Sequence, residues 1–228
     1  MAKSPTHFLA LPLHRHASLS AALSSFQADV TSPMSFALPD AAVRPPGTLH
    51  LTLGVMNLPQ KSNVDAAITL LQQVKAHSIL QAARERAGEP AQGSLRIHLK
   101  GLQAMGSEEK ATVLYVPPED ADPACQGLLY SFASDLKTKF VEAGIMESET
   151  RPMLLHATVL NTIYVKGRKR GKDRLTIDAR HILARYEDFV WAENVDIEEV
   201  GLYKMGAQPV EGTDDVEYVA EAKVLLVQ

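Results

Sequence analysis

The chain has little of what secreted and membrane proteins need. It contains 228 residues and a single cysteine, Cys125, so it cannot form an internal disulfide, which is typical of a protein in a reducing compartment. No apolar run approaches the ~20 residues that span a bilayer. Residues 1–6 also lack the basic segment followed by an apolar segment that marks a secretory signal. We therefore expect an intracellular protein, cytoplasmic or nuclear or both, with no membrane partner.

Sequence motifs for binding metals and nucleoside triphosphates are also absent. The chain has no His-Glu-x-x-His motif, no paired cysteines and no acidic ladder, which are the usual sequence signs of a metal site. It has no glycine-rich phosphate loop of the Walker type. The net charge of −4 argues against a protein that coats nucleic acid nonspecifically. We expect a protein that works without a metal or other cofactor.

What is present is the composition of a globular protein, with 46% hydrophobic and 22% charged residues. The hydrophobic periodicity predicts strands at 6–13, 48–56, 94–102, 111–116, 155–159, 196–204 and 216–227. It predicts helices at 18–30, 63–87, 122–144 and 178–189, with Asn63, Asp122 and Asp178 as N-caps. Strands and helices mixed without strict alternation favour an α+β fold.

Two short segments of the chain share one pattern. Residues 49–53 read Leu-His-Leu-Thr-Leu, and residues 155–159 read Leu-His-Ala-Thr-Val, 106 positions later. Successive side chains of a strand point to opposite faces, so one face of each strand is apolar. The other face carries His50 and Thr52 in the first strand and His156 and Thr158 in the second. We expect both polar pairs to face a common groove.

Two imidazoles that face each other suit the cleavage of a phosphodiester. A neutral imidazole takes a proton from the attacking oxygen, and an imidazolium gives a proton to the leaving oxygen; both forms exist near neutral pH. A threonine hydroxyl beside each histidine can hold a non-bridging phosphate oxygen. One such triplet alone would be a weak signal, since histidine and threonine also occur in ordinary strands. Two triplets at corresponding places in two half-chains favour the functional interpretation.

The same segments resemble the two-histidine (2H) phosphoesterases. The resemblance is greatest to the phosphoesterase domain shared by A-kinase anchoring protein 7 and subunit 1 of the activating signal cointegrator 1 complex. It covers nearly the whole chain and lies in residues 6–13, 49–56 (Leu-His-Leu-Thr-Leu-Gly-Val-Met), 155–162 (Leu-His-Ala-Thr-Val-Leu-Asn-Thr) and 178–183, followed by Phe189. The 155–162 segment is similar to that of the cointegrator subunit in particular.

The resemblance implies a bilobal, LigT-like α+β fold of two pseudo-symmetric lobes that flank a central cleft. It also implies that His50 and His156 are acid/base residues and that Thr52 and Thr158 bind phosphate. The cointegrator subunit carries an additional KH RNA-binding domain. Because residues 1–228 begin almost at the first phosphoesterase strand, we expect one domain of two lobes and no KH domain here.

Further residues are candidates for binding substrate. Lys166 and Arg168 belong to a basic run, residues 166–174, that could grip an RNA backbone or form a solvated hairpin tip. Tyr203 could stack on a base or belong to the core. Arg151 and Arg44 each lie shortly before a His-x-Thr strand, where they could hold phosphate or lie on the surface.

The sequence therefore predicts a metal-independent phosphodiesterase that acts on RNA ends or small nucleotides. The reaction would open a 2′,3′-cyclic phosphate or cleave a 2′-5′ or 3′ phosphodiester. The alternative is a nucleotide- or RNA-binding module without catalysis that serves as a subunit of a nuclear transcription or repair complex. RNA ligation, the reverse reaction, is a third possibility.

Overall fold

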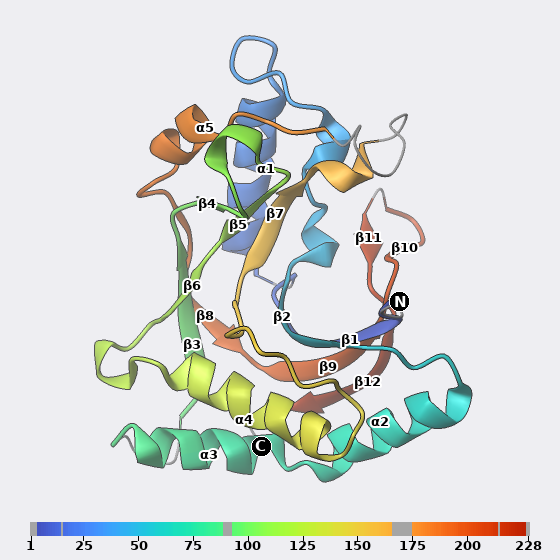
Figure 1. Cartoon of the computed structure of the whole chain (residues 1–228). Coiled ribbons are helices and arrows are strands. Elements are labelled where there is room, and N and C mark those ends of the chain that lie inside the picture. The colour runs from blue at the N-terminus through green and yellow to red at the C-terminus, as the bar shows by residue number, and fades with distance from the viewer. Residues whose placement is uncertain (1–3, 15, 89–92, 166–174, 214, 227–228) are drawn as a thin grey trace.

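The computed structural model describes residues 4–14, 16–88, 93–165, 175–213 and 215–226 and has an α+β fold (Figure 1). Within these residues the strands form a seven-stranded sheet, a three-stranded sheet and a two-stranded hairpin. Every pairing in them is antiparallel. The α+β class expected from the sequence is confirmed.

The large sheet is where the two His-x-Thr segments meet. Its strand order is β12-β9-β1-β2-β7-β5-β4. The strands are β1 (His7–Pro12), β2 (His50–Met56), β4 (Gln103–Ala104), β5 (Val113–Val116), β7 (Ala157–Asn161), β9 (Glu199–Lys204) and β12 (Ala220–Leu225). A single register pair, Leu51 with Ala157, joins β2 to β7. The sheet therefore consists of two halves that meet along the two motifs.

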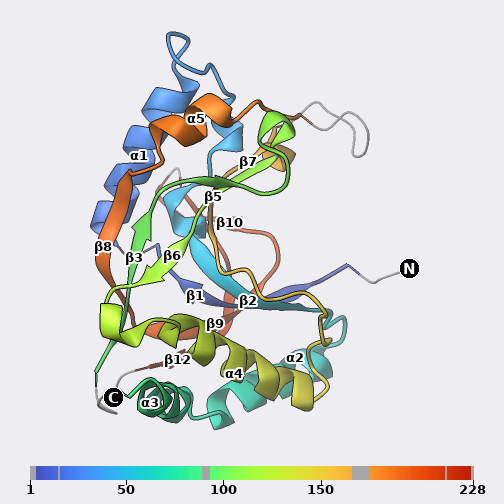
Figure 2. The ribbon, with the colours of Figure 1, turned by 60° about the vertical axis from the view of Figure 1, so that its left-hand side comes forward.

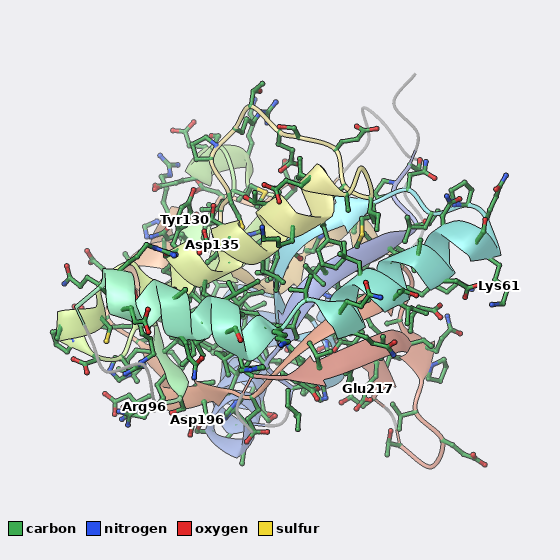
Figure 3. All side chains as sticks on the ribbon, turned by 90° about the horizontal axis from the view of Figure 1, so that it is seen from below. Lys61, Arg96, Tyr130, Asp135, Asp196 and Glu217 are labelled. Atoms are coloured by element: carbon green, nitrogen blue, oxygen red, sulfur yellow. The ribbon has the colours of Figure 1, made fainter. Side chains whose placement is uncertain are left out.

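Three helices cover one face of the β12-β9-β1-β2 half, namely α2 (Lys61–Gln73), α3 (Ala76–Arg86) and α4 (Leu128–Glu142). Figure 3 looks onto this face and shows α3 beside α4, where Arg86 forms an ion pair with Asp135. Leu9 and Leu51 join the main core, whereas Phe8 belongs to a small separate cluster. Strand alternation thus puts two apolar surfaces on the two faces of β1.

The β12-β9-β1-β2 half and its three helices form one lobe. The other lobe is built around the three-stranded sheet β6-β3-β8, on which α1 (Ala17–Thr31) packs. These strands are β3 (Leu95–Lys100), β6 (Pro118–Asp120) and β8 (Val190–Ile197). The ring of Phe26 in α1 lies 5.1 Å from that of Trp191 in β8. Both views place α1 and α5 (Arg180–Arg185) at the end opposite α2, α3 and α4 (Figures 1 and 2). The bilobal arrangement that the resemblance implies is present.

The helix predicted at 63–87 is wrong in two respects. It begins earlier, at Lys61, whose ammonium pairs with Asp65 one turn later at 2.8 Å, so Asn63 is not the cap. It also breaks at Val74, where an extended backbone (ψ 108°) separates α2 from α3. Apolar residues continue at helical spacing across the break, which hides it in the sequence. No helix in the described ranges is long and apolar enough to cross a membrane.

Asp122 caps only a short 3-10 turn, Pro123–Cys125, and not the helix predicted from 122. Gly127, with a left-handed φ of 84°, is the N-cap of α4, which begins at Leu128. The carboxylate of Asp120 instead accepts hydrogen bonds from the backbone of Gly127 and Leu129, at 2.7 and 2.9 Å.

The C-terminal third also divides more finely than predicted. The helix predicted to Phe189 ends at Arg185, and the ring of Phe189, beyond this end, meets that of Trp191 edge-on with 5.2 Å between centroids. The strand predicted at 196–204 is two strands in different sheets, since β8 ends at Ile197 and β9 begins at Glu199. The last predicted strand is likewise two. It comprises β11 (Val216–Glu217), which pairs with β10 (Gln208–Pro209), and β12.

Candidate active site

The pairing of β2 with β7 places the two His-x-Thr motifs side by side (Figure 1). In this antiparallel register His50 is next to Thr158, and Thr52 is next to His156. The charge of His156 also acts on His50. All four polar side chains are half-buried. The apolar residues that alternate with them are buried, namely Leu49, Leu51, Leu53, Leu155, Ala157 and Val159. The expected alternation is confirmed, and the register of Leu51 with Ala157 places the two polar pairs on the same face of the sheet.

Both histidines are anchored in the same way. The Nδ1 atom of His50 lies 2.7 Å from the carbonyl oxygen of Thr48, and Nδ1 of His156 lies 2.8 Å from that of Leu154. A carbonyl oxygen only accepts, so each Nδ1 carries the proton and donates it. Each neutral imidazole then keeps an unprotonated Nε2. The residue two positions before each histidine thus sets the tautomer that general acid/base chemistry requires.

His50 lies among aromatic rings. The centroid of its ring is 4.9 Å from that of Phe8 and 5.3 Å from that of Tyr218, which meets it edge-on. These residues border a hollow of about 190 Å³, here called the His50 hollow, which Pro12, Tyr203 and Lys223 also line. The ring of His50 therefore contacts aromatic rings beside a small hollow whose lining also includes the polar side chains of Glu217 and Lys223.

These surroundings control the protonation of His50. Burial lowers the pKa of His50 to about 4, and the nearby positive charges of His156 and Arg44 act in the same direction. The hydrogen bond to the carbonyl of Thr48 opposes the shift without cancelling it. His50 is therefore a neutral imidazole at physiological pH, with Nε2 able to accept a proton.

His156 has more open surroundings. It lines a hollow of about 620 Å³, here called the His156 hollow, together with Thr52, Met105, Arg151 and Leu154. The side chains of Met105 and Leu154 are 40% and 50% exposed, which gives this hollow an accessible apolar wall. The ring of Tyr115 meets that of His156 edge-on, with 5.3 Å between centroids. A bulky group attached to a phosphate at His156 would have room here.

A family model described as the AKAP7 2'5' RNA ligase-like domain matches residues 5–224. The chain belongs to this family. An uncharacterised protein of Schizosaccharomyces pombe, C15D4.13c, is 27% identical over 220 residues, which cover 96% of each chain. Mouse activating signal cointegrator 1 complex subunit 1 is 26% identical over 159 residues, which are 63% of this chain and 42% of that protein. The resemblance to 2H phosphoesterases seen in the sequence is confirmed.

A solved structure shows the same fold. Escherichia coli LigT in complex with 3'-AMP superposes with a TM-score of 0.53 at 19% sequence identity, over 99% of this chain and 100% of that one. At this identity the likeness concerns the fold. The LigT-like architecture expected from the sequence is therefore confirmed for this member of the AKAP7 2'5' RNA ligase-like family.

The other residues predicted to bind substrate lie in different places in the structure. Arg151 lines the His156 hollow. Tyr203 lines the His50 hollow, but it is 5% exposed and stacks on Phe8 with 5.5 Å between centroids. Its ring lies across Gly201, where a Cβ atom would come within 2.3 Å, so the structure favours a core tyrosine over a base-stacking one. Lys166 and Arg168 lie outside the described residues.

Two aromatic residues of the site were not singled out in the sequence. Phe8 lies in β1 on the face opposite Leu9 and Leu11, so its position on that face could have been predicted from strand alternation. Tyr218 follows β11 and reaches His50 only through the fold, which leaves no local signal. In the described part of the chain, no three His, Cys, Asp or Glu side chains gather as they do around a metal ion.

Proposed function

We propose that this protein is a 2H phosphodiesterase in which His50 is the general base and His156 the general acid. The observation that supports this most is the paired geometry. Two His-x-Thr motifs lie side by side on β2 and β7, with both imidazoles anchored through Nδ1 to a carbonyl oxygen. Binding alone does not require two acid/base groups presented in the same tautomer.

The proposed reaction moves two protons. Nε2 of neutral His50 removes a proton from water or a ribose hydroxyl, whose oxygen attacks phosphorus. The bond from phosphorus to the leaving oxygen breaks, and His156, as imidazolium, gives that oxygen a proton. His50 ends protonated and His156 neutral, and exchange with solvent restores both. The hydroxyls of Thr52 and Thr158 donate hydrogen bonds to the non-bridging oxygens, where charge increases in the transition state.

The proposed substrates are RNA ends or small nucleotides, and the reaction needs no metal. The name of the family refers to 2'5' RNA ligase, and LigT has been solved with 3'-AMP. Both names support a nucleotide phosphodiester, either a 2′,3′-cyclic phosphate or a 2′-5′ or 3′ linkage. The two unequal hollows beside the histidines suit a phosphate with a bulky group on each side.

One observation favours a second candidate, a binding module without turnover. The relative from mouse is a subunit of the activating signal cointegrator 1 complex, which supports a role for this chain as a nucleotide- or RNA-binding subunit of a nuclear transcription or repair complex. Such a module would keep the cleft and bind nucleotides without cleaving them.

The deciding experiment incubates the purified protein, in EDTA, with three short RNAs. One ends in a 2′,3′-cyclic phosphate, one is 2′-5′ linked and one is an oligouridylate. Products are resolved by mass, and the double variant His50→Ala/His156→Ala is the control. Turnover that persists in EDTA and disappears in the variant supports the enzyme and identifies the bond. Binding without turnover of any substrate contradicts the enzyme and supports the module.

A further inference from the structure

Arg44 lies at the junction of the two motif strands. Its backbone N–H donates to the carbonyl oxygen of Val159 in β7 at 2.9 Å, and Val43 forms a bridge with Leu160. Arg44 also lies six residues before His50, in the segment that leads into β2. The position of its side chain is therefore tied to both strands of the site.

The guanidinium of Arg44 stacks on the ring of Tyr164. Its central carbon lies 3.8 Å from the centroid of the Tyr164 ring, close enough for a cation–π interaction. The charge of Arg44 also acts on the nearby Tyr218 hydroxyl, where it opposes the rise of the pKa that burial causes. Tyr218 meets the ring of His50 edge-on. Arg44 and Tyr164, which are distant in sequence, thus place a cation close enough for its charge to act on His50.

This cation is buried without a carboxylate. Arg44 is 8% exposed, and none of the ion pairs among the described residues includes it. Removing a guanidinium from water is costly unless an anion pairs with it. The described aromatic ring on which it stacks is that of Tyr164, which does not neutralise it, and its charge acts on His50. Among the residues that the structure describes, this guanidinium therefore has no negatively charged partner, and an anionic ligand would supply one.

We propose that Arg44 binds the anionic phosphate of the ligand and supplies the principal positive charge for it. A guanidinium presents several donors in a plane that matches phosphate oxygens. The stacking on Tyr164 holds that plane before the ligand arrives, which reduces the entropy lost on binding. The identity of the phosphate as a scissile phosphodiester rests on the proposed function, whereas the recognition of phosphate by Arg44 does not.

Arg84 provides a matched control for the loss of a buried arginine. It is 9% exposed and donates to the carbonyl oxygen of Ser94 at 3.2 Å from α3, in the helical layer on the other face of the sheet. Comparing Arg44→Gln with Arg84→Gln separates recognition of phosphate from general destabilisation. Arg44→Lys keeps the charge and loses the planar fork.

The experiment measures the affinity of each variant for 2′-, 3′- and 5′-AMP and for adenosine by calorimetry. Because one charged hydrogen-bonding partner is lost, Arg44→Gln should weaken the tightest AMP isomer about ten- to a hundredfold and leave adenosine unchanged. Arg44→Lys should recover part of the loss, and Arg84→Gln should match the wild type.

Three results would overturn the role of Arg44. They are a wild type that binds AMP no better than adenosine, an Arg44→Gln variant with unchanged AMP affinity, and equal losses in Arg44→Gln and Arg84→Gln. If AMP binding depends on Arg44 but the wild type cleaves no RNA, the role of Arg44 stands and the phosphodiesterase proposal fails.

Discussion

The two motifs have the same local geometry and different surroundings. His50 and His156 each donate Nδ1–H to the carbonyl oxygen two residues earlier. His50, however, lies between Phe8 and Tyr218 beside a hollow of about 190 Å³, whereas His156 lines one of about 620 Å³. The repeated motif supplies a pair of equivalent groups, and the unequal surroundings make one of them the base in our proposal.

The largest expected effect comes from removing either histidine. His50→Ala and His156→Ala should each lower kcat/KM on RNA by about 10²- to 10⁴-fold, the usual contribution of a general acid or base. Both side chains are half-buried beside existing hollows, so thermal unfolding should change little. Steady-state kinetics and calorimetry measure the two quantities. The variants His50→Gln and His156→Gln are measured beside the alanine variants, because glutamine keeps a polar side chain and guards against loss of folding. Wild-type activity in any folded variant of either histidine would contradict the mechanism.

The threonines should contribute less than the histidines. Thr52→Val and Thr158→Val keep the shape of the side chain and remove one hydroxyl donor to the phosphate. We expect each to lower kcat/KM by about ten- to a hundredfold, the value of one hydrogen bond to a charged group. Loss in one variant alone would show that a single threonine holds the phosphate. Full activity in both would exclude the assigned role.

The contrast between the histidines also predicts how stability depends on pH. The pKa of His50 is about 4 in the folded protein against an ordinary value of 6.5. Between these values the unfolded chain binds the proton more readily, so His50 makes the free energy of unfolding decrease as pH falls from about 6.5 to about 4. Urea titrations across this range should show a smaller decrease for His50→Gln than for the wild type. Parallel curves would contradict the burial of His50.

The smallest effect should come from the contact that positions Tyr218. Gly47 packs so closely on β11 that a Cβ atom would lie 2.6 Å from the carbonyl oxygen of Val216, and its N–H donates to Asp215 at 3.0 Å. Gly47→Ala should therefore destabilise the protein by about 1–3 kcal/mol and displace Tyr218 from His50. Chemical denaturation measures the first effect, and kcat/KM should fall several-fold. A substitution without effect on either would show that this contact does not support the His50 side.

The sequence located both motif strands because their signal is local, although β7 begins at Ala157, two residues after the predicted start at 155. Alternation in residues 49–53 and 155–159 is enough to separate the polar pairs from Leu51 and Ala157, and the resemblance supplied the two lobes. Local patterns also misplaced the ends of helices. At Val74 the helical spacing of apolar residues continues across the break between α2 and α3. They did not reveal the contact of Tyr218 with His50, because it joins segments that only the fold brings together.

In the proposed reaction His50 is the base and His156 the acid. The most direct test compares each single alanine variant on two phosphodiesters of one nucleoside, with a ribose or a p-nitrophenol leaving group. p-Nitrophenolate leaves without a proton, so the proposed roles predict that His156→Ala recovers most of its activity on the aryl ester while His50→Ala remains inactive on both. Recovery of His50→Ala in place of His156→Ala would reverse the roles, and recovery of neither would contradict the division of labour.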